Sequence, residues 1–178
     1  MGRPQKSREG REAAFLDTFE SHHVPLFRFA YRLTGSVADA EDIVQKCFLD
    51  LLRPGCSYDS ARTPIRVYLF GAVRNQAFKR LRKRNSAEPG EPEAAHYPSP
   101  ESEYLRGEME DIVANAVGDL PDAQRDVLIL AHYEQIPLAE VARIMDLELG
   151  AVKSRLQRAR NALKLTLAAY GSEVERKL

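Results

Sequence analysis

A run of basic residues near the C-terminus is the part of this sequence whose residue types and spacing most directly suggest a chemistry. Five cations occur between positions 153 and 164 with no acid among them, namely Lys153, Arg155, Arg158, Arg160 and Lys164. Apolar residues lie between them at helical intervals, namely Val152, Leu156, Ala159 and Leu163. This pattern predicts a helix with one buried face and one cationic face. Such a face is complementary to the phosphates of a nucleic acid.

The residues that precede this helix predict how it is presented. Apolar residues at helical spacing form a second stripe, namely Leu138, Val141, Ala142 and Met145, and only residues 146–149 remain for a turn. The sequence therefore predicts a helix-turn-helix, whose second helix contacts base edges with its N-terminal residues and phosphates with its flanks. The predicted DNA contacts are Gly150, Lys153, Ser154, Arg155, Arg158 and Arg160. Gly150 has no side chain to obstruct a close approach. A solvated basic helix in an all-α bundle is the alternative interpretation.

No arrangement of residues indicates catalysis or a metal site. The histidines are scattered, no Ser or Cys nucleophile occurs in a recognisable motif, and no glycine-rich phosphate loop is present. Cys47 and Cys56 have neither a second pair nor metal-ligand spacing, so neither a disulfide framework nor a zinc site is indicated. We interpret Cys47 as a buried thiol. We expect no enzymatic activity, no cofactor and no metal.

Charge is unevenly distributed along the chain, although the 178 residues have a formal net charge of zero. Eight basic residues and no acids occur from Arg62 to Arg84, whereas eleven acids and two cations occur from Glu88 to Asp126. The local field, and not the net charge, attracts phosphate, so two basic blocks can bind nucleic acid beside an acidic middle. The alternative is a set of solvated faces.

The sequence shows no sign of membrane insertion or secretion. No apolar run approaches the roughly 20 residues that a membrane helix needs. The N-terminus lacks the hydrophobic stretch of a secretory signal. We therefore expect a cytoplasmic protein.

The predicted fold is all-α, with two small helical domains joined by a flexible linker, because no strand pattern interrupts the helical periodicity. The linker is expected at residues 85–103, where four prolines and several acids occur without apolar periodicity. A disordered arm is expected at 1–11, an N-terminal helical domain at 12–84 and a C-terminal helix-turn-helix domain at 104–178.

Capping residues and apolar stripes predict the individual helices. In the first domain, helices are expected at Glu12–Glu20, at Val24–Thr34, at Val37–Arg53 after the N-cap Ser36, and from Thr63 to Arg84. The third helix is expected to bury Ala40, Ile43, Val44, Cys47 and Leu51. The fourth is expected to bury Ile65, Tyr68, Leu69, Ala72, Val73 and Leu81. In the second domain, helices at about 101–117 and 121–133 precede the helix-turn-helix.

Four stretches in a fixed order resemble a known family. They are YRLTGSVADAEDIVQKCFLDLL at 31–52, IRVYLFGAVRNQAFKRLRKR at 65–84, LPDAQRDVLIL at 120–130 and GAVKSRLQRARNAL at 150–163. Together they resemble an extracytoplasmic-function (ECF) sigma factor of bacterial RNA polymerase. The resemblance implies that the chain binds core RNA polymerase and promoter DNA and directs promoter recognition and transcription initiation. It also implies an anti-sigma factor as a further partner, which no residue here indicates by itself.

The resemblance implies roles for residues of the first domain. Those that match the segment docking on the clamp helices of the polymerase's largest subunit are Asp39, Glu41, Asp42, Gln45 and Phe48. Those that match the element recognising and melting the minus-ten region are Tyr58, Arg62, Arg66, Tyr68, Arg74, Asn75, Lys79 and Arg80. The basic C-terminal helix would contact the upstream, minus-thirty-five box. Ordinary capping explains Asp39 and Glu41 equally well, and a core position explains Tyr68.

The sequence also departs from the family, and a second interpretation stays open. Lys46 and Cys47 stand where an acid and a small residue are usual, Tyr68 where Trp is common, and Lys79 where Asp often occurs. The alternative is a helix-turn-helix regulator with a helical sensing or dimerisation domain and no polymerase contact. The basic block from Arg62 to Arg84 argues against it, because a sensor domain does not need a cationic surface.

Overall fold

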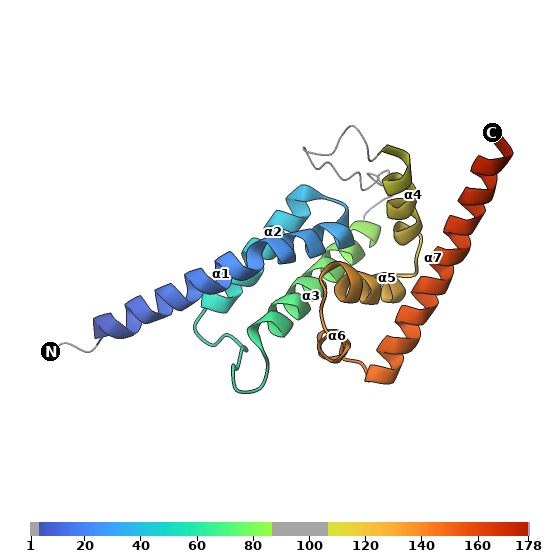
Figure 1. The fold of residues 1–178 in the computed structure, drawn as a ribbon. Coiled ribbons are helices and arrows are strands. Elements are labelled where there is room, and N and C mark those ends of the chain that lie inside the picture. The colour runs from blue at the N-terminus through green and yellow to red at the C-terminus, as the bar shows by residue number, and fades with distance from the viewer. Residues whose placement is uncertain (1–3, 87–106, 178) are drawn as a thin grey trace. The chain divides into compact units, whose positions relative to one another are not determined.

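The computed structural model describes residues 4–86 and 107–177, and every regular element in these ranges is helical (Figure 1). The chain divides into two compact units, Met1–Ala95 and His96–Leu178. The predicted all-α fold with two helical domains is therefore confirmed. Within the described ranges, no helix combines the length and the apolar character needed to cross a membrane.

Within residues 4–86, the first unit has three helices that each pack against the other two, α1 (Pro4–Thr34), α2 (Val37–Leu52) and α3 (Ile65–Ser86). Their shared core consists of side chains that are at most 7% exposed, namely Leu26, Phe29, Ala30, Leu33, Ala40, Ile43, Val44, Cys47, Phe48, Val67, Leu69, Phe70, Val73 and Ala77. The rings of Phe29 and Phe70 join α1 to α3 at 5.3 Å between centroids. These contacts fix the faces that α2 and α3 turn outward.

Helix α1 is continuous, whereas the sequence predicted two helices preceded by a disordered arm. It begins at Pro4, so residues 4–11 of the predicted arm are helical, while 1–3 lie outside the described residues. Pro25 lies inside the helix and removes one backbone hydrogen bond, at a cost of about 3 kcal/mol or more. Leu26, Phe29 and Ala30 follow it with no exposed surface. Burying two large apolar side chains contributes about 1.5 to 3 kcal/mol each, which offsets the missing bond.

Helix α2 begins as the sequence predicted, whereas α3 begins at Ile65, two residues after the predicted start at Thr63. The Ser36 hydroxyl accepts a hydrogen bond from the Asp39 backbone N–H at 3.3 Å, which confirms the N-cap of α2. Helix α3 follows Pro64 and continues to Ser86, so the first two residues of the predicted linker are helical. The remainder of that prediction, 87–103, lies outside the described residues.

The second unit contains α4 (Gly107–Gly118), α5 (Asp122–Leu128) with a π-helical last turn (Ile129–Tyr133), α6 (Leu138–Met145) and α7 (Leu149–Lys177). The helix-turn-helix is confirmed, since three residues separate α6 from α7 and the two helices pack together. Asp146 ends α6 in the left-handed conformation, with φ of 52° and ψ of 54°. Its backbone N–H donates to the Ala142 and Arg143 carbonyls. Glycine usually occupies such a left-handed position at the end of a helix, and Asp adopts this conformation less easily than glycine does.

Candidate functional site

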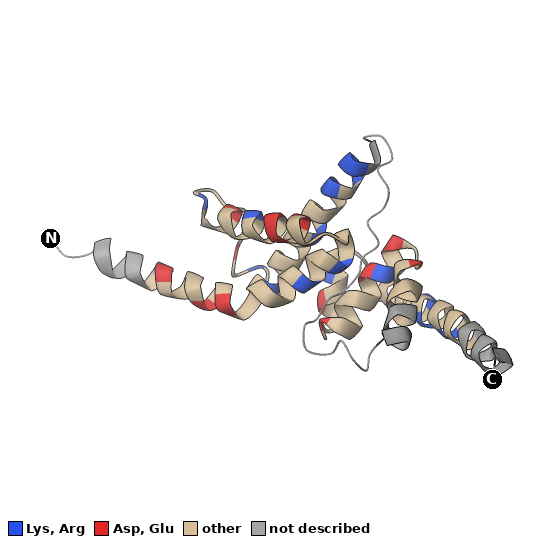
Figure 2. Ribbon diagram, turned by 90° about the horizontal axis from the view of Figure 1, so that it is seen from above, with Lys and Arg blue, Asp and Glu red and all other residues tan. Residues whose placement is uncertain are grey.

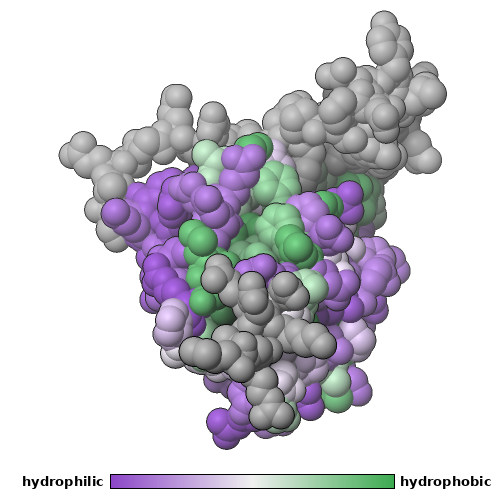
Figure 3. All heavy atoms as spheres, turned by 90° about the vertical axis from the view of Figure 1, so that its left-hand side faces the viewer, coloured by the Kyte–Doolittle hydropathy of each residue, from purple (hydrophilic) through white to green (hydrophobic). Residues whose placement is uncertain are grey.

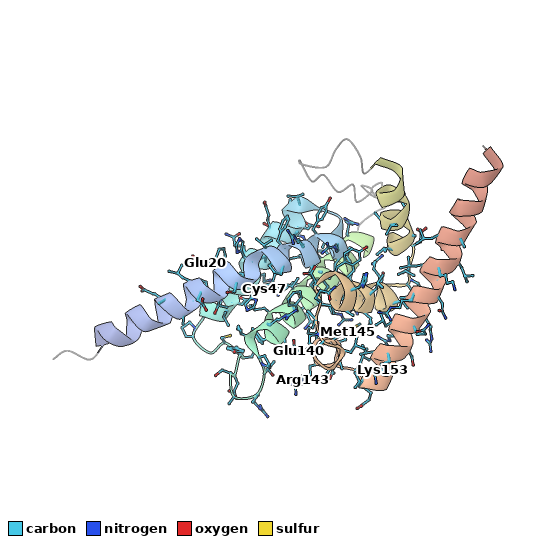
Figure 4. The ribbon with its side chains drawn as sticks, viewed as in Figure 1. Glu20, Cys47, Glu140, Arg143, Met145 and Lys153 are labelled. Atoms are coloured by element: carbon cyan, nitrogen blue, oxygen red, sulfur yellow. The ribbon has the colours of Figure 1, made fainter. Side chains whose placement is uncertain are left out.

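The first half of α7 separates an apolar face from a cationic face. Val152, Leu156 and Ala159 are buried at 0%, 5% and 0% exposure and pack α7 into the second unit. The other predicted DNA contacts turn outward: Gly150, Lys153, Ser154, Arg158 and Arg160 are exposed and Arg155 is half-buried. Figure 4 shows Lys153 near the N-terminal end of α7. The structure thus brings these predicted residues onto one accessible helix.

Gly150 and Gln157 add detail to this face. A Cβ built at Gly150 would meet nothing within 4 Å, so internal packing does not require glycine there. Gln157, which was not among the predicted contacts, is exposed and follows Lys153 and Ser154 by four and three residues. Its Nε2 donates to Asn161 Oδ1 at 3.0 Å. The i, i+3 and i+4 spacing would have placed Gln157 on this face.

The outward face of α3 gathers cations around one aromatic ring. Arg74 places its Cζ 4.7 Å from the centroid of the Phe78 ring. Asn75, Lys79 and Arg82 are exposed beside this pair, and the five side chains line a shallow hollow. Figure 2 shows Lys and Arg gathered toward the C-terminal end of α3. Phe78 and Arg82 were not among the predicted contacts, although they are spaced at helical intervals from Arg74 and Asn75.

The loop before α3 is tied to its first turn through Tyr68. The Tyr68 hydroxyl lies 3.5 Å from Cys56 Sγ and 3.4 Å from Ser57 Oγ, and its ring lies 5.1 Å from that of Tyr58. The hydrogen bond with Cys56 raises the pKa of Tyr68. Tyr68 is half-buried and positions the loop, so it differs from the fully buried residue that the sequence predicted.

The remaining predicted minus-ten residues differ in their accessibility. Arg62 is exposed in the loop before α3, and Arg66 is half-buried in the first turn of the helix. Phe70, an aromatic that could have received a base, is 1% exposed and belongs to the core. The accessible side chains of this part of the chain therefore lie in the loop and on the face of α3 between Arg74 and Arg82.

Arg80 is directed toward α2. Its Nε donates to Asp39 Oδ1 at 2.8 Å, and its terminal nitrogen donates to Asp42 Oδ2 at 3.1 Å. Hydrogen bonds to Asp42 and Asp39 raise the pKa of the guanidinium. A residue predicted to contact DNA and two predicted to contact polymerase are therefore paired with each other.

Phe48, one of the predicted polymerase contacts, is almost fully enclosed by other side chains of the first unit. It is 3% exposed and packs against Phe19 and Phe15, with centroid distances of 4.9 Å and 6.1 Å. The reason is that α1 packs along α2 and places the rings of Phe15 and Phe19 against this side of it. Glu41, Asp42 and Gln45 remain exposed.

An apolar groove of about 840 Å³ runs between α1 and α2 beside these polar residues. Its lining residues are Phe15, Phe19, His23, Val24, Phe27, Arg28, Glu41, Val44, Gln45, Phe48, Leu49 and Leu52. Val24, Leu49 and Leu52 are 41%, 52% and 57% exposed. Figure 3 shows hydrophobic surface surrounded by hydrophilic side chains on this side of the molecule. An apolar concave surface with a polar edge is typical of a protein-binding site.

Comparison with known proteins decides between the two interpretations of the sequence. The family model for Sigma-70 region 2 matches residues 18–87, and the model for Sigma-70 region 4 matches residues 110–163. The ECF RNA polymerase sigma factor SigL of Mycobacterium tuberculosis (strain H37Rv) is 33% identical over 165 residues, covering 90% of this chain and 93% of SigL. The chain belongs to the ECF sigma factors.

Other relatives agree with this assignment. The ECF sigma factor SigW of Bacillus subtilis is 27% identical, with 93% of this chain and 95% of SigW covered. The sigma factor RpoE, solved in complex with the anti-sigma factor NepR from Bartonella quintana, superposes with a TM-score of 0.72 at 26% identity, covering 87% of this chain and 97% of RpoE. CnrH, solved with the cytosolic domain of CnrY, gives a TM-score of 0.69 at 25% identity, covering 93% and 94%.

This ECF sigma factor is an alternative sigma factor that directs promoter recognition and transcription initiation, with core RNA polymerase and promoter DNA as its partners. The region 2 match extends over the N-terminal unit, where the alternative interpretation required an unrelated sensing domain. That alternative is therefore wrong.

Proposed function

We propose that three surfaces divide the work of this sigma factor. The exposed side of α2 and the groove beside it bind core polymerase, α3 with its preceding loop binds and melts the minus-ten region, and the first half of α7 binds the upstream box. The observation that supports this division is the segregation of charge. Two exposed acids lie on α2, of which Glu41 lines the apolar groove and Asp42 follows it in the sequence. The outward faces of α3 and α7 are cationic instead.

The polymerase surface combines apolar area with charge. An amphipathic helical partner, such as the clamp helices of the largest subunit, would place apolar residues between α1 and α2. Glu41 and Gln45 at the edge would then fix the register through charge and hydrogen bonds. Phe48 would support the floor of the groove and Asp39 would hold Arg80, so neither would be a primary contact.

The α3 surface suits DNA whose strands have separated. Melting exposes bases, which need aromatic faces or pockets, and phosphates, which need cations. The aromatic faces would come from Tyr58 in the loop and Tyr68 in the first turn of α3. The cations and a polar amide would come from the helix, namely Arg74, Lys79 and Asn75. Arg62 and Arg66 would contact the backbone of the strand as it enters.

The α7 surface suits the major groove of an intact duplex. Lys153, Ser154 and Arg155 in the early turns would contact base edges, and Gly150 would permit the approach. Arg158 and Arg160 would contact phosphates. Removing a base contact costs about 1 to 3 kcal/mol at one sequence position, whereas removing a phosphate contact weakens binding to all sequences alike. Arg155→Ala and Arg158→Ala, titrated against sequence and salt, separate these roles. Identical losses that are independent of sequence would contradict the division.

Binding alone accounts for this role, so we propose that the protein has no catalytic activity and works in the cytoplasm, where RNA polymerase transcribes. RpoE was solved with an anti-sigma factor and CnrH with a domain of CnrY. By analogy we propose that an anti-sigma factor inhibits this chain by covering the polymerase and DNA surfaces.

The decisive experiment combines the purified full chain with core polymerase and selects bound DNA from a random promoter library. We expect two shared boxes at fixed spacing in the selected DNA and transcription from them. Glu41→Arg should abolish co-purification with core polymerase, because the new cation opposes the expected charge of the partner. Lys46→Glu is the matched control, since Lys46 is an exposed residue of α2 that does not line the groove. If folded Glu41→Arg bound core polymerase as well as the control, the polymerase surface would be misassigned.

A further inference from the structure

The guanidinium of Arg74 lies over the ring of Phe78 on the outward side of α3. The core positions of this stretch of α3 are Val73 and Ala77, which have no exposed surface. Phe78 is half-buried at the side of that core, with Arg74 lying 4.7 Å above its ring. Leaving a large aromatic partly in water forgoes burial energy, so the position is better suited to contact with a ligand.

The surroundings of this pair indicate the chemistry of that ligand. Asn75, Lys79 and Arg82 are exposed around it, and none of the five described side chains that line the hollow is acidic. A guanidinium is planar and weakly hydrated and can stack between two flat π systems, which a lysine ammonium cannot do. Flanking cations attract phosphates, and an amide can hydrogen-bond to the edge of a base.

We propose that Arg74, positioned over Phe78, forms a stacking site for one unpaired base of single-stranded DNA, with Lys79 and Arg82 on the phosphates beside that base. The assignment rests on the proposed role of α3 in minus-ten binding and adds to it a particular platform. Phe78 is a positioning residue here, because its ring orients the guanidinium on which the base lies. Asn75, adjacent to the pair, would contact the edge of the stacked base.

The test needs no knowledge of the promoter, because stacking accepts every base. The full chain is titrated into a labelled oligothymidylate of about 12 nucleotides, within the range of single-strand site sizes, and into a strand of the same length without bases. Fluorescence anisotropy at several salt concentrations reports the two affinities. Phe78→Leu removes the ring, Phe78→Tyr retains it, and Arg74→Lys keeps the charge but loses the planar group. Circular dichroism establishes that each variant is folded.

We expect Phe78→Leu and Arg74→Lys to weaken binding to oligothymidylate by at least about fivefold, the lower end for one stacked base, and to leave the baseless strand unaffected. Phe78→Tyr should restore wild-type affinity. Lys79→Gln and Arg82→Gln should weaken binding to both strands equally. Each should also reduce the salt dependence by about 0.7, because one phosphate fewer is neutralised.

Two results would overturn the stacking site: a wild-type chain that binds both strands equally, or variants that lose the same affinity for both. If Lys79→Gln and Arg82→Gln still reduced the salt dependence, α3 would remain a DNA-binding surface and only the stacking site would be wrong. If neither cation variant changed binding, the proposed role of α3 would fail as well.

Discussion

Arg80 of α3 and Asp39 of α2 form a two-point contact, in which Nε and a terminal nitrogen of the guanidinium lie 2.8 Å and 2.7 Å from the same carboxylate oxygen. Asp42 accepts a further bond from the same guanidinium. Asp39 is the more enclosed acid, with 18% of its side chain exposed against 61% for Asp42. The pair therefore joins the proposed polymerase-binding helix to the proposed DNA-binding helix.

Replacing Arg80 should affect packing between helices more than DNA binding. Arg80→Gln should lower the free energy of unfolding by no more than about 1 kcal/mol, because exposed ion pairs contribute little, and added salt should reduce the difference. Chemical denaturation at low and high salt measures this effect. Lys79→Gln is the matched variant, because Lys79 is exposed on the side of α3 that is proposed to bind DNA. If Arg80→Gln reduced the salt dependence of single-strand binding as much as Lys79→Gln, Arg80 would be a phosphate contact after all.

Phe48 should behave as a core residue. Phe48→Ala should lower the free energy of unfolding by about 3 to 5 kcal/mol, because the ring is buried against Phe15 and Phe19. Gln45→Ala, on the same helix but exposed, should change it by less than about 0.5 kcal/mol. Denaturation midpoints compared at equal slopes give both values. A decrease below about 1 kcal/mol for Phe48→Ala would mean that α1 does not cover this side of α2 in solution.

The elements that were predicted correctly are those defined by local patterns. The cap of α2, its stripe of Ala40, Ile43, Val44 and Cys47, and the two stripes of the helix-turn-helix all depend on residues a few positions apart. Local spacing determines which face of a helix is apolar, so these features follow from the sequence alone.

The features that were missed depend on helices distant in sequence. Pro25 suggested a helix start because the backbone hydrogen bond that it removes is a local effect, visible in the sequence. The burial of apolar side chains that offsets this loss comes from contacts with α2 and α3. Phe48 could not be separated from exposed Gln45 without knowing that α1 extends over it. The side of α3 on which Arg80 lies is likewise decided by two acids 38 and 41 positions away.

The stability of the first unit should depend on pH through Cys47. Burial raises the pKa of this thiol from its ordinary value of 9.0 to about 12, because the thiolate would lose its hydration. Figure 4 shows Cys47 among the helices of the first unit. Above pH 9 the unfolded chain releases this proton while the folded chain keeps it. The stabilisation is therefore complete below pH 9 and is lost as the pH rises toward 12, with a limiting slope of about 1.4 kcal/mol per pH unit.

Unfolding free energies between about pH 8 and pH 10.5 test this dependence, with Cys47→Ala as the comparison. The alanine variant should be less stable at pH 8 and should lose less stability as the pH rises, since other groups titrate equally in both proteins. In the native state at pH 8, a thiol reagent should modify Cys56, which is half-buried, and should leave Cys47 intact. Rapid native modification of both thiols, or parallel pH profiles, would contradict the burial of Cys47.

Gly150 should matter to DNA binding and not to folding. A Cβ at this position meets nothing inside the chain, and Ala is a better helix former than Gly, so Gly150→Ala should leave the melting temperature unchanged or slightly raised.

At the start of α7, however, the added methyl group would lie between the helix and the bases. We expect weaker binding of the variant holoenzyme to a promoter with an intact upstream box, and no change on a promoter from which that box has been removed. Gly118→Ala is the control, because Gly118 is equally open but ends α4 and is not among the proposed DNA contacts. Equal promoter affinity for both variants would show that DNA does not approach Gly150, and the contact surface would then have to begin further along α7, at Lys153 and Ser154.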